Sequence, residues 1–132
     1  MSGAPSKSAS VLSNNQFEFD FPYQGSQHAT LTIRRHPRWG NDVIFRIEKG
    51  QVLCNSYDRC RINVRFDDAQ PRRLSGNEPS DNSTETVFIP GYNDFVSRLS
   101  RAKTVRIEVD IYQQGPLVAE FNVEGFDAGK LK

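Results

Sequence analysis

Residues that build catalytic, metal and cofactor sites are scarce in this sequence. Its 132 residues include two cysteines, two histidines, one methionine and one tryptophan, and both histidines precede the cysteines by a long stretch. A structural zinc site needs about four Cys or His ligands close together. The motifs G-x-S-x-G and H-E-x-x-H, the EF-hand loop and the Gly-rich phosphate loop are all missing. The sequence therefore predicts a protein that is not an enzyme, with no catalytic residues, no metal and no cofactor.

An excess of charge of one sign is missing as well. The 17 basic and 16 acidic side chains leave a net charge of +1, whereas proteins that wrap nucleic acid need a basic excess. No apolar run approaches the roughly 20 residues that cross a bilayer, and the opening MSGAPSKSAS lacks the apolar core of an export signal. Its Ser, Gly and Pro predict a flexible leader over residues 1–16, followed by a single β-rich domain over residues 17–132.

The sequence is rich in alternation of apolar and polar residues. This period of two runs through residues 17–21, 30–34, 43–48, 60–66, 105–111 and 118–123, and it predicts strands with one buried face. Shorter strands are expected at residues 52–54 and 86–89. A short edge strand is expected at residues 72–74, inside the polar loop 71–85.

Only residues 92–102 show helical spacing, and Asn93 or Asp94 is the expected N-cap. The sequence therefore predicts a mainly β fold, an antiparallel β-sandwich or partly open barrel of seven to eight strands with one α-helix near residues 92–102. The apolar residues of the helix are Tyr92, Phe95, Val96, Leu99 and Ala102.

The two cysteines, Cys54 and Cys60, are separated by five residues. This spacing exceeds that of C-x-x-C redox motifs, and both residues fall where one strand turns into the next. A hairpin there would bring them together, so a disulfide is expected, which would place the protein in an oxidising compartment such as a periplasm. The alternative is a pair of reduced thiols in a cytosolic protein.

Candidate acid–base residues lack a catalytic setting. His28 begins a strand and His36 precedes a proline, which is typical of surface histidines. Asp67 and Asp68 end a strand and Asp81 lies in a polar loop, so these carboxylates are expected to mark solvated turns. A hydrolase with an unrecognised site would need a histidine within hydrogen-bond reach of a carboxylate or serine.

Aromatic and basic residues in two expected loops form the candidate binding site. Trp39 lies in the loop from Arg35 to Asn41, and Tyr57 lies between the cysteines beside Asp58 and Arg59. Tryptophan, tyrosine and arginine are enriched in interface hot spots, although each aromatic ring could instead cover the core. The predicted binding residues are Arg35, Arg38, Trp39, Tyr57 and Arg59.

The basic loop also suggests a second class of partner. The segment from Arg34 to Trp39 combines cations with a ring that could stack on a base, and further arginines could join it if their strands are neighbours. Acidic residues at equivalent outward positions favour a different interpretation of these arginines, in which opposite charges pair across neighbouring strands. The arginines are Arg59, Arg61, Arg65, Arg72 and Arg73, and the acidic residues are Glu18, Asp20, Glu108 and Asp110.

From Gly50 onward the chain resembles small proteobacterial envelope proteins, distantly those of the VasI/TagO type that assist type VI secretion. The shared pattern is a cysteine-bearing turn, a strand such as CRINVRFDD, a polar loop, a helix such as FVSRLSRAK and a closing FNVEGFD. The resemblance implies a fold and an envelope location, and it implies no catalytic residues. The residues that carry it are Asp67, Phe95, Leu99, Val105, Phe121, Val123, Gly125 and Phe126.

These observations support one leading hypothesis and one alternative. The first is a non-catalytic binding module of the bacterial envelope, a secretion-system accessory or immunity-like protein, whose partner is another protein. An exported form would need a signal that residues 1–10 do not contain. The alternative is a cytosolic, phage-encoded protein that binds nucleic acid or nucleoprotein through the basic and aromatic loop.

Overall fold

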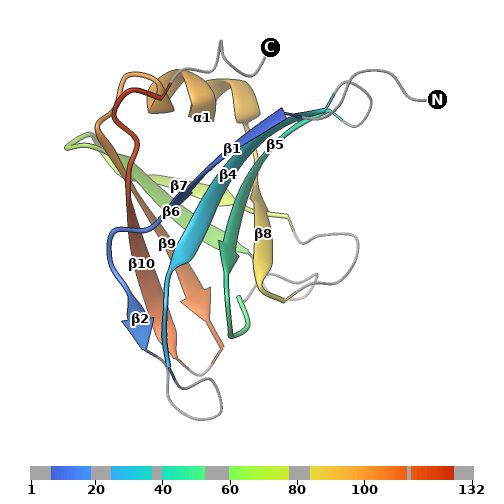
Figure 1. Cartoon of the computed structure of the whole chain (residues 1–132), viewed down its shortest axis with the longest axis vertical. Coiled ribbons are helices and arrows are strands. Elements are labelled where there is room, and N and C mark those ends of the chain that lie inside the picture. Colours follow the sequence, from blue (N-terminus) through green and yellow to red (C-terminus); the bar gives the residue numbers. More distant parts are fainter. Residues whose placement is uncertain are drawn as a thin grey trace.

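The computed structural model describes residues 7–18, 25–36, 40–52, 60–77, 84–112 and 114–126, without the side chain of His36. These residues form two four-stranded antiparallel sheets that face each other, with one helix across one end (Figure 1). The predicted class, a mainly β antiparallel sandwich with one helix, is confirmed. No helix in the described ranges is long and apolar enough to cross a membrane.

Sheet A has the strand order β1-β4-β5-β8 and sheet C the order β10-β9-β6-β7. Strands β2 and β3 form a separate two-stranded ribbon, sheet B. In chain order the elements are β1 (Lys7–Leu12), β2 (Phe17–Glu18), β3 (Ser26–Gln27), β4 (Ala29–His36), β5 (Gly40–Ile47), β6 (Arg61–Phe66), β7 (Arg72–Ser75), β8 (Thr86–Ile89), α1 (Tyr92–Leu99), β9 (Thr104–Ile111) and β10 (Gly115–Asn122).

The inward residues of both sheets meet in one hydrophobic core. Phe45 of β5 and Phe121 of β10 are fully buried and touch edge to face, with ring centroids 6.3 Å apart. From α1, Phe95 packs on Phe66 at 5.3 Å between ring centroids. Alternation in the strands therefore places one side chain in two in this core, as the sequence predicts.

Backbone hydrogen bonds join the sheets at both edges. Beside β7, Asn77 exchanges two bonds of 2.9 Å with Phe88 of β8, each residue donating its N–H to the carbonyl of the other. At the opposite edge the Asn14 N–H donates to the Glu120 carbonyl of β10 at 2.7 Å. There the Glu120 N–H also donates to Asn15 Oδ1 at 3.0 Å. These contacts tie the sandwich along both sides without merging its sheets.

Several boundaries differ from the sequence-based expectations. Residues 7–12 form β1 and not part of a flexible leader, because backbone pairing with β4 holds a segment whose inward side chains are small. The helix begins after Gly91, whose φ of 77° is left-handed, and neither Asn93 nor Asp94 caps it. It ends at Leu99, short of residue 102. Val52 makes a single bridge to Ile111 and belongs to no named strand.

Asp67 connects the end of β6 to the start of β9. Its backbone adopts a left-handed φ of 50°, and its carboxylate Oδ1 accepts the N–H groups of Lys103 at 3.0 Å and Thr104 at 2.9 Å. The two backbone bonds, from Thr104 first and Lys103 next, lower the pKa of Asp67 below its ordinary value. Asp67 is therefore a structural acceptor, and the turn expected after Phe66 is present.

Replacing Asp67 with asparagine should reduce stability more at neutral pH than in acid. A carboxylate whose pKa is lower in the folded state stabilises the protein above its unfolded pKa, and this contribution disappears as pH falls through the folded pKa. Urea unfolding at pH 7 and below about pH 3 checks this, because wild type and D67N should converge in acid. Asparagine is the suitable replacement because it tolerates left-handed φ. An equal gap between the two proteins at both pH values would contradict the role of the charge.

Candidate binding groove on sheet A

Most of the predicted binding residues lie outside the described part of the chain. These residues are Arg38, Trp39, Tyr57 and Arg59. Cys54 also lies outside the described residues. Arg35 is described: it lies half-buried near the end of β4, opposite Lys7 on β1 and Asn41 on β5. Cys60 is buried, but its pairing with Cys54 stays a prediction because Cys54 is not described.

The described residues instead reveal a groove on the outer face of sheet A, with a volume of about 680 Å³. Strand register places its side chains in cross-strand rows. One row is made of Ser10, Thr32, Ile44 and Phe88, and the next is made of Thr30, Arg46 and Thr86. The groove therefore crosses all four strands of the sheet.

Two of these outward residues are apolar where an antiparallel sheet ordinarily presents polar side chains to water. Ile44 of β5 and Phe88 of β8 are direct cross-strand partners and are only half-buried. Hydroxyl groups continue the same row, where Ser10 Oγ and Thr32 Oγ1 lie 2.8 Å apart in a hydrogen bond. The floor of the groove thus combines an apolar patch with groups that can donate and accept hydrogen bonds.

The two arginines of the groove differ in their partners. Arg34 is held by Asp42, its cross-strand neighbour, with Nη2 2.5 Å and Nε 3.1 Å from Oδ2. Within the described ranges, the side chain of Arg46 makes no hydrogen bond or ion pair with another residue. Glu48, one residue beyond the end of β5, accepts the backbone N–H of His28 at 3.1 Å through its side chain. Arg46 is therefore the cation of this surface that is available to a ligand.

His28 has a structural role in the part of the chain that is described. Its Nδ1 lies 2.8 Å from the Ser13 carbonyl oxygen and its Nε2 lies 3.2 Å from Gln16 Nε2. The buried Ser13 hydroxyl meanwhile donates to the Asn15 carbonyl and accepts the Ala29 N–H. These contacts do not bring a catalytic pair together. Among the described residues, no group of three or more His, Cys, Asp and Glu could hold a metal ion.

The expected basic clusters do not merge. Arg34 faces outward from sheet A, whereas Arg61, Arg65 and Arg73 face outward from sheet C, on the opposite side of the sandwich. Opposite charges do pair across strands, as in Arg106 of β9 with Glu120 of β10 at 2.9 Å. The hydrogen bond from Arg106, followed by one from Asn14, lowers the pKa of Glu120. The cross-strand explanation for outward charges is thus confirmed at this pair.

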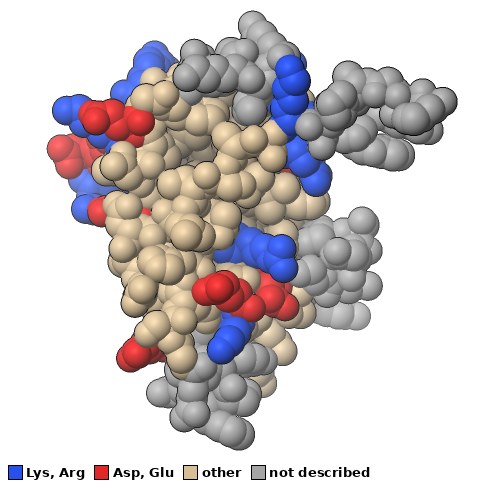
Figure 2. Space-filling model, viewed as in Figure 1, with Lys and Arg blue, Asp and Glu red and all other residues tan. Residues whose placement is uncertain are grey.

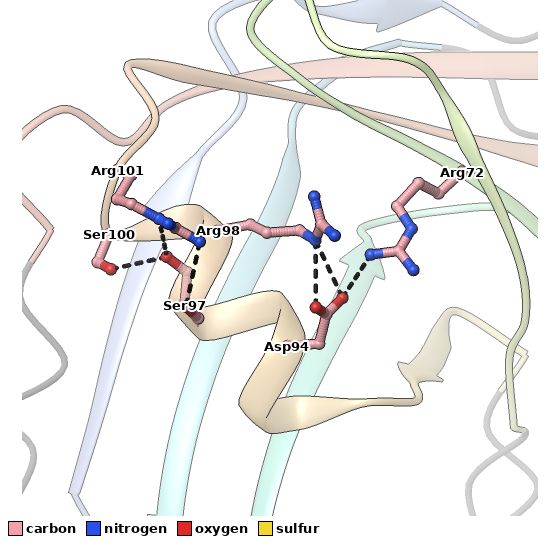
Figure 3. A network of polar contacts seen from close by, with 6 residues as sticks. All are labelled: Arg72, Asp94, Ser97, Arg98, Ser100 and Arg101. Atoms are coloured by element: carbon pink, nitrogen blue, oxygen red, sulfur yellow. Dashed lines mark hydrogen bonds and ion pairs between the residues drawn. The ribbon is translucent and has the colours of Figure 1, made fainter.

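A second polar network lies on the exposed side of α1 (Figure 3). Asp94 accepts Arg98 Nε at 3.1 Å and Arg72 Nη1 at 2.6 Å, and Arg101 turns back to the Ser97 carbonyl at 3.3 Å. Desolvation raises the pKa of Asp94, but the hydrogen bond from Arg98 and the charges of Arg72 and Arg98 outweigh it and lower the pKa. Exposed ion pairs of this kind contribute little to stability. Because Arg72 and Arg98 already pair with Asp94, their charges are not available to a ligand.

Sequence reasoning overlooked the groove although it contained a signal for it. Ile44 occupies an outward position of β5, in phase with Arg46 and Glu48, and Phe88 does the same on β8. An apolar residue in the polar phase of a strand marks an outer face that is not simply solvated.

No known protein family, curated protein or solved structure matches this chain.

Proposed function

We propose that the protein is a non-catalytic binding module whose partner is another protein, and that the groove on sheet A is the contact surface. The observation that carries the proposal is the outward pair Ile44 and Phe88 beside Arg46. A small apolar centre with an arginine at its margin is the composition of interface hot spots. Hydroxyl groups around it would complete a polar rim.

The setting that we propose is the bacterial envelope, with a role as a secretion-system accessory or immunity-like protein. Two sequence features support it, namely the expected disulfide of Cys54 with Cys60 and the resemblance that begins at Gly50. A nucleic-acid partner receives less support, because Arg34 is neutralised by Asp42 and the arginines of sheet C lie on the other side of the sandwich. The envelope fraction of a host cell is therefore the expected source of the partner.

Replacing Phe88 with serine should weaken partner binding by at least about tenfold, the loss typical of a hot-spot side chain. The measurement is a pull-down from separate envelope and cytosolic fractions, followed by titration of the retained protein against wild type and F88S. Because Phe88 faces outward, the melting temperature should change little. The matched control is V118S on the outer face of sheet C, where Val118 is 44% exposed.

Equal binding by F88S and V118S would exclude the groove as the contact surface. A partner recovered only from the cytosolic fraction would exclude the proposed setting. R46E should weaken binding as well if the arginine contacts an acidic group of the partner, so the two variants test the apolar and the charged part of the groove separately.

A further inference from the structure

Charged side chains of both signs share the outer face of sheet C. Strand register places Arg61 and Arg65 of β6 and Arg73 of β7 in the phase that points away from the core. Glu108 and Asp110 occupy the same phase of β9. Figure 2 shows basic and acidic side chains together along the left margin, the side on which β6, β9 and β10 lie in Figure 1. The β6 and β7 half of this face is therefore basic, and the β9 and β10 half is mainly acidic.

The charges of this face are only partly paired within the chain. Arg61, Arg73 and Asp110 are exposed, and their side chains make no hydrogen bond or ion pair with any residue that the structure describes. Neighbouring outward charges do have partners, as in Glu108, whose Oε1 accepts the Asn63 side-chain amide at 3.2 Å. The face thus retains unpaired groups of both signs.

The acidic half of the face decides which kind of partner fits it. A nucleic acid or an anionic membrane would be attracted to Arg61 and Arg73 but repelled by the carboxylates of β9 and β10. A partner with acidic and basic groups in a matching arrangement would satisfy both halves. A second copy of this chain carries that arrangement. The net charge of +1 also leaves little long-range repulsion between two copies.

The charge pattern selects the direction of a two-fold axis between the copies. An axis in the contact plane that runs along the strands, between β6 and β9, places β6 of one copy over β9 of the other and β7 over β10. Arg61 then faces Asp110 of the second copy, because continuing the β6 and β9 register puts both residues in one cross-strand row. In the next row Arg73 lies over Val118, which is 44% exposed, beside Glu108. An axis across the strands would instead place arginine over arginine.

The third row of the face is the weakest part of this fit. It contains Arg65 and Arg106, so arginines of different copies would meet there. Glu120 neutralises Arg106 at 2.9 Å, and Arg65 Nε donates to the Ala69 carbonyl at 3.1 Å. The attraction between the copies therefore comes from the other two rows.

We propose that two copies of this chain associate through the outer faces of their sheets C, about a two-fold axis parallel to the strands. Arg61 of each copy pairs with Asp110 of the other, and Arg73 of each copy pairs with Glu108 of the other. A standard interface involves about 20–30 residues a side, more than one four-stranded face supplies. The dimer is therefore weak, with a dissociation constant of about 10 µM to 1 mM. The grooves on sheet A stay exposed on the two outer sides.

Sedimentation equilibrium of the full chain tests this proposal. In about 20 mM salt, and at protein concentrations up to about 1 mM, wild type should form dimers and no larger species, because a two-fold contact closes on itself. Raising the salt to about 500 mM should weaken association at least about fivefold, since exposed ion pairs are screened. R61E and D110K should each weaken it at least about tenfold, because each sets like charges against each other. R46E, a charge reversal on the outer face of sheet A, should dimerise as wild type does.

A mixture of R61E and D110K separates a lost contact from a lost fold. In the mixed dimer the introduced carboxylate faces the introduced ammonium group, and the remaining Arg61 faces the remaining Asp110. The mixture should therefore recover the affinity of wild type to within about threefold, which a variant that fails to fold could not do. Circular dichroism melting of each variant gives the same check independently.

Several outcomes would overturn the proposal. One is a wild type that stays monomeric at about 1 mM in low salt. Another is dimerisation of R61E and D110K that equals that of wild type, or a mixture of the two that stays monomeric. A dimer that R46E or F88S abolishes would place the contact on sheet A, and it would overturn the proposal as well.

Discussion

Replacing Phe121 with alanine is expected to lower the free energy of unfolding by about 3–5 kcal/mol, which would leave a domain of this size close to unfolded. The ring is fully buried, and its edge-to-face contact with Phe45 joins β10 of one sheet to β5 of the other. Removing it deletes both apolar burial and an aromatic pair. The sheets cannot collapse into the cavity because backbone pairing holds each strand in place.

Urea unfolding followed by circular dichroism measures this loss. The matched control is V118A on the same strand, where the side chain points outward and is 44% exposed. It should change the free energy of unfolding by no more than about 0.5 kcal/mol. A loss below about 1 kcal/mol for F121A would mean that Phe121 does not lie in the shared core.

Replacing Gly76 with alanine is expected to destabilise the protein, because even one added methyl group has no room there. An ideal Cβ at this position would lie 2.5 Å from Ile62 Cδ1, 2.7 Å from Val87 Cγ2 and 2.8 Å from Cys60 Sγ. Ile62 and Val87 are fully buried and belong to different sheets, so neither can move aside freely. Overpacking of this kind costs about 1–3 kcal/mol, and G76A should lose that amount in urea unfolding.

A second substitution tests the cause of this loss. I62V removes the Cδ1 atom that lies nearest to the added methyl group, so G76A combined with I62V should be more stable than the sum of the two single losses predicts. Ser75 is exposed beside Gly76, and S75A should have almost no effect. Strict additivity of G76A and I62V would show that the loss comes from the backbone and not from the contact with Ile62.

Period-two alternation predicted which side chains enter the core in the regular strands. In β9 the apolar residues from Val105 to Ile111 are buried, as expected. Phe121 in β10 and Val123 just after it are buried as well, which also agrees with the prediction. Residues 86–89 form β8 with the predicted bounds. These features could be read locally because alternation depends only on the pleat of a strand.

Features that depend on a segment far away in the sequence could not be predicted from local alternation. The sequence of β1, KSASVL, has little apolar content, and it becomes a strand because β4 offers an edge with which it can pair. The N-cap of α1 was wrongly assigned to Asn93 or Asp94, although the helix starts at Tyr92 as expected, since Gly91 supplies the turn through its left-handed backbone and not through a capping side chain. Neither feature leaves a periodic signal.

The local sequence of apolar and polar residues thus determines the class of fold, which side chains of the main strands face inward, and the presence of a helix. Tertiary structure alone decides which strands become neighbours. Only that pairing sets Ile44 beside Phe88 on the outer face of sheet A. The physical reason is that pleat and helical pitch act over a few residues, whereas a groove or an edge arises where segments far apart in the chain meet.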